Sequence, residues 1–207
     1  MFKNYKQKSK IEEGGEIFSP PLKNYLKNYC KLSEQAVKKI IAVTHFRQLN
    51  TAEILVKENE IFPFEIVLIK GLLRAYYIND NGEDVNINFF ADSTVITPHF
   101  LRTLNNKNSI NLQALEICSV ALINYNEFQS LCKKNKEIMQ FAESTTENEL
   151  LARIEKERTY IKNNADKRLI YFRNKFPGFE NRIAHYHIAS YLNITPISLS
   201  RIRGKKQ

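Results

Sequence analysis

The sequence contains little of what marks several protein classes. Among 207 residues there is no tryptophan, and there are two methionines and three cysteines. Because Cys30, Cys118 and Cys132 are far apart and form no CxxC pair, we expect neither a disulfide framework nor a zinc site. Buried, reduced thiols in a cytoplasmic protein are the simpler interpretation.

Long apolar runs are absent as well. No stretch approaches the 18 residues that suggest a membrane span, and Lys70 interrupts the apolar segment from Ile66 to Leu73. The first ten residues are charged and no apolar segment follows them, so no signal peptide is expected. We expect no membrane as a partner.

Catalytic patterns are also missing. The strand-rich part of the chain has one histidine, His99, and the sequence shows no nucleophile–base pair, no His/Glu metal set and no glycine-rich phosphate loop. On a helix, the side chains of His185 and His187 would point apart, so we expect them to face solvent or phosphate rather than a metal. The sequence thus predicts no enzymatic activity, no catalytic residue, no metal and no cofactor.

Positive charge is plentiful, and it is concentrated at one end. The chain has 31 Lys and Arg against 22 Asp and Glu, a net charge of +9. The last 49 residues, from Thr159, hold ten of the basic and two of the acidic residues, a net +8, which leaves +1 for the first 158 residues. A basic C-terminal module makes nucleic acid the first partner to test.

The order of sequence patterns predicts an α+β protein. Residues 1–21 carry Gly14-Gly15 and Pro20-Pro21, and we expect a poorly ordered tail there. Helical spacing follows from Leu22 to Phe46, with Ser33 as an N-cap for a helix that extends to Thr44. After Gln48 come short runs of Ile, Val, Phe and Tyr, which predict strands at Ile54–Val56, Glu65–Lys70, Leu72–Ile78, Val85–Phe90 and Leu112–Asn124.

Turn residues separate these runs. Asn79-Asp80-Asn81-Gly82 predicts a hairpin turn, and Gly71 predicts a sharp turn or a close approach of two backbones. Many short strands with no helix between them are typical of a sandwich or a jelly-roll-like β-roll. We expect that roll to lie within residues 22–134.

A long helix is expected after a short one at Glu127–Asn135. Lys136–Lys162 contains no Gly or Pro and, at 27 residues, exceeds a typical globular helix. Arg158 interrupts an otherwise apolar or small stripe made of Phe141, Thr145, Asn148, Leu151, Ile154 and Ile161. Such a helix often pairs with a second copy, so residues 135–162 are expected to be a dimerisation helix. The alternative is packing of this stripe against its own domain.

Residues 163–207 are expected to form an all-α module. Asn163 or Asn164 would cap a helix at Ala165–Phe176, which Pro177-Gly178 ends. A helix at His185–Leu192 would then be joined by a tight turn at Asn193 to a second helix, which has Thr195 as N-cap and Pro196 at its first position. This spacing predicts a helix-turn-helix.

The second helix of this motif would enter the major groove of DNA. Arg201 is expected to pair with a guanine edge, or else to contact a phosphate or solvent, and Ile197 could pack on a thymine methyl group. Hydroxyl groups and free N–H groups at the helix start suit phosphate oxygens. The expected DNA-binding residues are Thr195, Pro196, Ile197, Ser198, Ser200, Arg201, Arg203 and Lys205.

A β-roll, a long helix and a helix-turn-helix in this order resemble the Crp–Fnr superfamily of bacterial transcription regulators, from about Leu22 to Lys206. The segments Lys70–Tyr77 and Ile188–Arg203 carry the resemblance, and the latter looks like short members common in Bacteroidetes. The resemblance implies a homodimer joined through the long helix and a cyclic-nucleotide-binding-like roll. It also implies a near-palindromic double-stranded DNA site.

The sequence departs from that family in ways that limit what carries over. Cyclic-nucleotide binders have a Gly-Glu pair and a later Arg-Ser/Thr-Ala; here Ser93 and Thr94 align with the pair and Asn108 with the arginine, which argues against cyclic AMP. The Arg-Glu pair that begins the recognition helix is Pro196-Ile197 in this chain. The N-terminal cysteine cluster of iron–sulfur members is missing.

We therefore expect a homodimeric, sequence-specific DNA-binding transcriptional regulator with a degenerate sensor roll. An unidentified small-molecule effector is compatible with the roll. The alternative is a ligand-sensing or scaffold protein whose C-terminal module binds another protein, which the apolar Pro196-Ile197 tip suggests.

Overall fold

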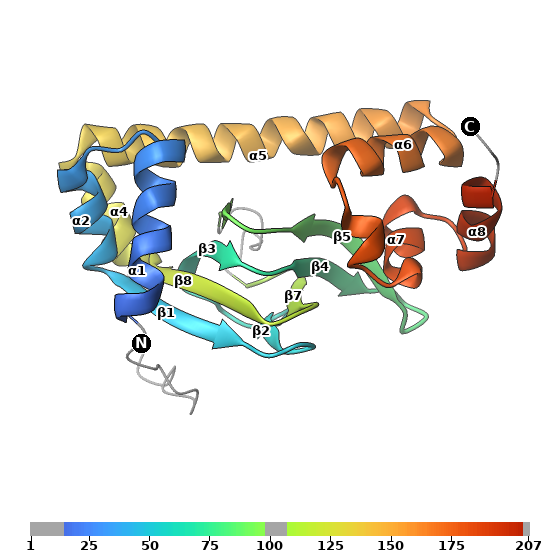
Figure 1. Cartoon of the computed structure of the whole chain (residues 1–207), viewed down its shortest axis with the longest axis horizontal. Coiled ribbons are helices and arrows are strands. Elements are labelled where there is room, and N and C mark those ends of the chain that lie inside the picture. Colours follow the sequence, from blue (N-terminus) through green and yellow to red (C-terminus); the bar gives the residue numbers. More distant parts are fainter. Residues whose placement is uncertain (1–14, 98–106, 205–207) are drawn as a thin grey trace.

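The computed structural model describes residues 15–97 and 107–204. Its architecture is α+β: a β-roll is flanked at one end by N-terminal helices and at the other by a C-terminal helical module, and one long helix spans the top of both (Figure 1). The long helix is α5, Lys136–Lys162, with the expected 27 residues. Asn135 caps it by accepting from the backbone N–H groups of Glu137 and Ile138.

The roll consists of two antiparallel four-stranded sheets. The first has the order β1-β8-β3-β6, with strands Thr44–Leu49, Cys118–Asn124, Phe64–Lys70 and Thr94–Ile96. The second has the order β2-β7-β4-β5, with strands Ile54–Val56, Asn111–Ala114, Leu73–Ile78 and Asp84–Phe90. The Asn79–Gly82 turn joins β4 to β5, with φ of 79° at Gly82, as the sequence predicts.

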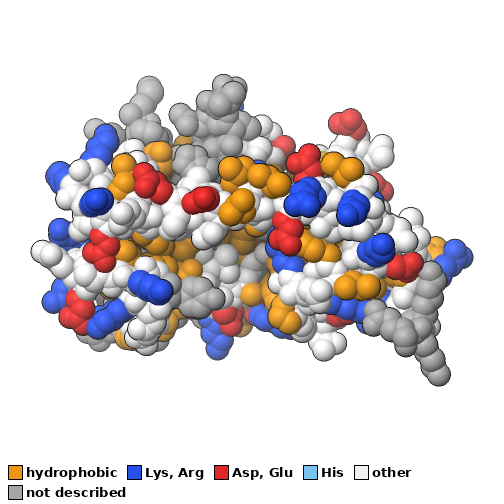
Figure 2. Space-filling view, turned by 90° about the horizontal axis from the view of Figure 1, so that it is seen from above, with side chains coloured by type: hydrophobic (Ala, Val, Ile, Leu, Met, Phe, Trp, Pro, Cys, Tyr) orange, Lys and Arg blue, Asp and Glu red, His pale blue; other side chains and the backbone are white. Residues whose placement is uncertain are grey.

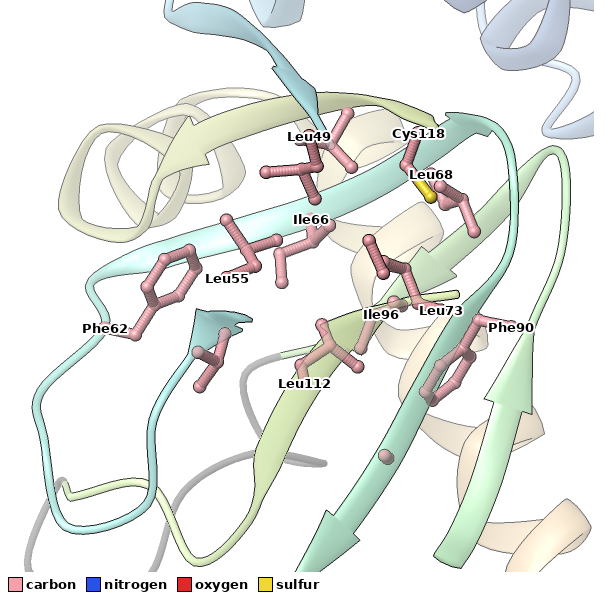
Figure 3. Close-up of a cluster of buried hydrophobic side chains, with 14 of the residues drawn as sticks. Leu49, Leu55, Phe62, Ile66, Leu68, Leu73, Phe90, Ile96, Leu112 and Cys118 are labelled. Carbon is pink, nitrogen blue, oxygen red and sulfur yellow. The ribbon is translucent and has the colours of Figure 1, made fainter. Parts of the chain in front are cut away.

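Because side chains alternate along the strands, one face of the first sheet packs on the second sheet and the other face packs on the N-terminal helices. On β3, Ile66 and Leu68 point between the sheets, while Val67 packs on the N-terminal helices. The layer between the sheets holds 16 buried residues, most of them aliphatic (Figure 3). Gly71, with φ of 111°, lies at the close approach expected of it: a Cβ atom there would be 2.6 Å from Cys118 Sγ. Cys118 and Cys132 are buried, and Cys30 is half-buried.

The helices before the roll are α1 (Gly15–Asn24), the π-helical turn η1 (Tyr25–Tyr29) and α2 (Glu34–Ile41). Helix α1 begins inside the segment expected to be poorly ordered, so that expectation is wrong for residues 15–21; residues 1–14 lie outside the described part. Leu22 and Leu26 are fully buried against the first sheet, and this packing outweighs the helix-breaking tendency of the two prolines. Ser33 caps α2, as expected, by accepting from the N–H of Ala36.

The strands differ from the sequence expectation at three places. The helical region ends at Ile41, and Thr44 begins an edge strand, β1, because pairing with β8 satisfies its backbone. The run Leu112–Asn124 is two strands in different sheets, separated at residues 115–117. The three-residue strand β6 was not expected; it pairs with Ile66–Leu68 of β3.

The remaining helices follow the sequence closely. They are α4 (Tyr125–Lys134), α6 (Ala165–Lys175), the 3₁₀ turn η2 (Phe179–Asn181), α7 (His185–Leu192) and α8 (Pro196–Gly204). Asn164, rather than Asn163, caps α6 through the N–H of Lys167. Gly178 takes a φ of 79° where α6 ends, as C-terminal glycines do.

Candidate nucleic-acid interface

Helices α7 and α8 form the expected helix-turn-helix. Asn193 joins them in the left-handed conformation, with φ of 54° and ψ of 51°. Ala189 is fully buried, and Leu199 at 1% exposure packs in the same core, so the two helices are held together where they cross. The motif lies at the C-terminal end of the molecule, beside the β4–β5 hairpin (Figure 1).

The start of α8 is built as a capped, open helix end. Thr195 Oγ accepts from the N–H of Ser198 at 3.1 Å, which is the capping bond predicted from the sequence. Pro196 then occupies the first helical position, and Ile197 next to it is 66% exposed. The outer surface of this first turn therefore combines an apolar side chain with N–H groups that the helix itself does not use.

The expected DNA-binding residues of α8 differ in their surroundings. Thr195, Pro196, Ile197, Ser200 and Arg201 are exposed and Ser198 is half-buried, while Lys205 lies outside the described residues. Arg201 forms no hydrogen bond or ion pair with any residue that the structure describes. Arg203 instead pairs with Glu180, Nε to Oε1 at 3.2 Å, and faces the ring of His185.

A buried polar network attaches α7 to the roll. Arg74 on β4 is 5% exposed; its Nη2 donates to Asp84 at 2.6 Å and its Nε donates to Gln113 at 2.7 Å. Arg74 Nη1 lies 3.2 Å from Nδ1 of His187. Ser190 of α7 donates to the backbone carbonyl of Asp84 at 3.0 Å. The helix-turn-helix thus shares hydrogen bonds with the edge of the second sheet.

His187 overturns the expectation that both histidines face solvent or phosphate. It is 6% exposed, and burial, together with the positive charge of Arg74, lowers its pKa to about 4. The ring is therefore neutral near pH 7, and its Nδ1 accepts a hydrogen bond from Arg74. His185 is exposed on the other side of α7. The two rings do point apart, as their spacing predicts, but one of them points into the protein.

An aromatic core fixes the module from beneath. Phe89 of β5 lies 5.4 Å from Tyr191 and 5.8 Å from Phe176, measured between ring centroids. Phe172 and Phe179 extend the cluster, and Leu72 of the roll is buried in it. The basic module that the sequence predicts therefore has no closed core of its own; part of its core belongs to the roll.

The stripe expected for dimerisation turns around α5 rather than staying on one face. Phe141 packs on Phe128 of its own domain, with ring centroids 6.4 Å apart, and Thr145 is half-buried beside it. Further along, the stripe is open to solvent: Leu151 is 56%, Ile154 44% and Ile161 80% exposed. Leu150, which is not part of the expected stripe, is 57% exposed beside them. Apolar side chains are visible along the top surface in Figure 2.

A pocket of about 370 Å³ opens between α5 and the roll. Its lining includes Ile87, Ser109, Ile110, Arg153, Lys156 and Tyr160. Lys156 donates to the backbone carbonyl of Ile87 and lies 4.1 Å from the ring centroid of Tyr191, and among the described residues it has no carboxylate partner. Burial and the nearby charges of Lys175 and Arg153 lower its pKa to about 7.

The positions aligned with the cyclic-nucleotide motif are occupied by structural side chains. Asn108 is 1% exposed and donates to the backbone carbonyl of Lys57 at 2.9 Å. Thr94 donates to the carbonyl of Ala91 at 2.7 Å. Ser93 and Thr94 line a separate pocket of about 450 Å³ between β6, the N-terminal helices and α5.

Solved structures share this fold, whereas comparison by sequence finds no relative. No protein-family profile and no curated protein matches the chain by sequence. Among solved structures, FixK2 from Bradyrhizobium japonicum matches with a TM-score of 0.68 and 15% identity, over 79% of this chain and 84% of that one. A regulator described as belonging to the crp/fnr family, from Eubacterium rectale, matches with a TM-score of 0.68 and 16% identity over 86% and 85%.

The chain has the Crp/Fnr fold. The c-di-GMP-responsive global regulator CLP of Xanthomonas campestris is a further match, with a TM-score of 0.69 and 14% identity over 84% of this chain and 91% of that one. These neighbours confirm the resemblance inferred from the order roll, long helix, helix-turn-helix. At such identities they establish the fold alone. Within the described residues, no helix has the length and apolarity needed to cross a membrane.

Sequence reasoning missed the contacts between the roll and the helix-turn-helix. Leu73 and Ala75 of β4 face the core between the sheets, so alternation puts Arg74 on the outer face, and the local sequence does not reveal that α7 covers it. Its partner His187 on α7 lies 113 residues further along the chain, so no local sequence pattern connects the two residues.

Proposed function

We propose that the protein is a homodimeric, sequence-specific DNA-binding transcriptional regulator of the Crp/Fnr type. The observation that carries the proposal is the first turn of α8, which is capped by Thr195, open to solvent and part of the last 49 residues, whose net charge is +8. Such a helix end offers N–H donors and a positive field to phosphate groups. Its architecture is the one shared with the regulators above.

Base contacts are assigned to the exposed face of α8. Arg201 has no described partner to release before it reaches a guanine, and a bidentate pair there is worth about 1–3 kcal/mol of discrimination. Ile197 would pack on a thymine methyl group. Thr195, Pro196, Ser198, Ser200 and Lys205 complete the proposed surface, with the hydroxyl groups directed to phosphates.

DNA binding is tested with the full chain and fragments of its own genomic neighbourhood, by fluorescence anisotropy at low and moderate salt. We expect affinity that falls steeply with salt, and a loss of about 5- to 100-fold on the preferred fragment for Arg201→Ala. Lys70→Ala, an exposed lysine on the roll, is the matched control and should bind normally. If no fragment binds, and a protein partner that needs the C-terminal module is found instead, the ligand-sensing or scaffold alternative replaces this proposal.

Homodimerisation is assigned to the C-terminal half of α5. Leu150, Leu151, Ile154 and Ile161 expose an apolar face on a helix too long to be covered by one domain, and two such helices would bury each other. Phe141, Thr145 and Asn148, at the other end of the proposed stripe, line pockets of their own chain and would contribute at its margin. The two helix-turn-helix modules of a dimer would then meet a near-palindromic site.

The oligomeric state is measured by sedimentation equilibrium. We expect a dimer that Ile154→Glu converts to a monomer, because two buried carboxylates would face each other across the seam. Gln140→Glu, exposed on the same helix more than three turns earlier, is the control and should remain dimeric. A wild-type monomer at concentrations well above those of DNA binding would contradict this part of the proposal.

The pocket between α5 and the roll is the proposed effector site. Lys156 and Arg153 of the long helix line it together with one acidic residue, Glu157, so two of its three charged side chains are positive. An anion there would raise the pKa of Lys156 and stabilise the folded state. Thermal unfolding with inorganic phosphate, cyclic AMP and small dicarboxylates tests this: we expect a shift with at least one simple anion, abolished by Lys156→Met, and none specific to cyclic AMP. A flat response would indicate an effector-independent regulator.

A further inference from the structure

Four polar side chains from four separate elements meet on one side of the helical module. They are Arg173 of α6, Glu180 of η2, His185 of α7 and Arg203 of α8. The side chain of Glu180 is 20% exposed, so much of its carboxylate is removed from water. A shielded carboxylate needs cationic partners, and the module supplies two.

Two arginines contact the carboxylate of Glu180, and Arg173 reaches both oxygens because its Nη2 also donates to Oε1 at 3.5 Å. Arg173 Nε donates to Oε2 at 2.6 Å, and Arg203 Nε approaches Oε1 at 3.2 Å. The Nη1 atom of Arg203 lies 2.7 Å from Nε2 of His185, so its guanidinium contacts two other elements of the module, with Arg203 and His185 both at the surface. Arg201, two residues earlier on the same helix, has none of these contacts among the described residues. The two arginines of α8 therefore have different surroundings.

The position of Arg203 along the helix adds to this contrast. It lies eight residues after Thr195, which places it about 12 Å further along the axis than the cap that would meet DNA. The last turn of a helix also favours a positive side chain through the helix dipole. An anchor at that end fixes the direction in which the exposed first turn points.

We infer that Arg203 and Glu180 are positioning residues that hold the recognition helix in place, and that Arg203 makes no phosphate contact. This inference rests on the proposed DNA-binding function and revises the role that the sequence alone suggested for Arg203. Arg203 fixes the orientation of α8 through its ion pair with Glu180, while Arg201 contacts the DNA directly. The two roles predict different responses to salt.

The test compares variants of the full chain on two duplexes: one selected by the wild type from a random library, and one of scrambled sequence. The plot of log K against log salt has a negative slope, and the loss of one phosphate contact makes that slope shallower by about 0.9. For Arg203→Ala we expect an unchanged slope and a preference for the selected duplex reduced by about fivefold, the upper range for an ion pair of this exposure. Arg47→Ala, which removes a comparably exposed ion pair with Glu53 in the roll, should change neither quantity.

Two further variants make the assignment specific. Glu180→Gln should make the salt dependence steeper, because Arg203 can then contact phosphates. It should also lower the preference for the selected duplex. Arg203→Lys, which keeps a cation beside Glu180 and leaves the Arg173–Glu180 pair intact, should retain most of the preference that Arg203→Ala loses. If Arg203→Ala instead makes the slope shallower by about 0.9 on both duplexes and leaves the preference intact, the inference is overturned and Arg203 is a phosphate contact.

Amide hydrogen exchange of α8 separates this inference from the proposed function. Arg203→Ala should speed exchange at residues 199–203, and Arg203→Lys should speed it less. If the wild type selects no duplex from the library, the proposed function fails while exchange still decides whether Arg203 anchors α8. Exchange that is identical in wild type and Arg203→Ala would overturn the anchoring role whatever the DNA result.

Discussion

The roll and the helical module are stabilised by different cores. Between the two sheets the buried side chains are mostly aliphatic, and Phe62 and Phe90 are the buried phenylalanines there (Figure 3). The module is centred on rings that contact one another, including Phe172, Phe176 and Tyr191. The roll encloses its core with its own two sheets, whereas the module completes its core with Phe89 and Leu72 from the roll.

Two neighbouring residues on β5 show how one strand serves both cores. Side chains alternate along a strand, so Phe90 points between the sheets and Phe89 points outward into the module. The module is therefore stabilised by docking, not only by its internal contacts. A change in the roll can therefore alter the stability of α7 and α8.

The largest expected effect comes from Phe89→Ala. Truncating a buried phenylalanine costs about 3–5 kcal/mol, and here the loss should fall on the module. We expect hydrogen exchange to accelerate across α6, α7 and α8 while β3 and β8 remain protected. Phe90→Ala is the matched control: a loss of similar size should appear in the strands. Equal acceleration of roll and module in both variants would show that the two cores unfold as one.

A smaller effect is expected from His187, which links the module to Arg74. Its pKa is about 4 in the folded protein against a usual value near 6.5, because it is buried beside a positive charge. Between these values the unfolded chain binds a proton that the folded chain does not, so stability falls as pH drops from 6.5 to 4, by up to about 1.4 kcal/mol per pH unit.

Urea unfolding at pH 7 and pH 5 measures this slope. His187→Gln, which can still accept from Arg74, should reduce the difference in unfolding free energy between the two pH values. His185→Gln, at an exposed site on the same helix, should leave it unchanged. A difference that persists in His187→Gln would assign the pH dependence to other groups.

The sequence predicts the module better than the roll, for a physical reason. Thr195, Pro196, Asn193 and Gly178 act within one or two turns of the residues they cap or terminate, so their roles can be inferred locally. Strand β1 is at a sheet edge and is defined by its pairing with β8, more than 70 residues away. The division of the run Leu112–Asn124 between two sheets is likewise set by partners distant in sequence.

The candidate site divides in the same way. The exposed face of α8 follows from helical spacing, and so does the open stripe at Leu151, Ile154 and Ile161. The inward turn of Arg203 does not, because Glu180 and His185 reach it only through the tertiary fold. Charge counts predict that the module is basic, but they do not tell which basic residues are already paired.

The smallest expected effect comes from an ion pair between the two regions. Arg182 of the module lies 2.5 Å from Glu116, in the turn between β7 and β8, and both side chains are more than one-third exposed. Exposed pairs contribute about 0–1 kcal/mol, and salt screens them. Arg182→Ala should therefore lower the free energy of unfolding by less than about 1 kcal/mol at low salt, measured with urea, and by nothing measurable at about 1 M salt. Because Phe89 would account for several times more, a loss in Arg182→Ala that matched Phe89→Ala would mean that charge, rather than the aromatic core, holds the module on the roll.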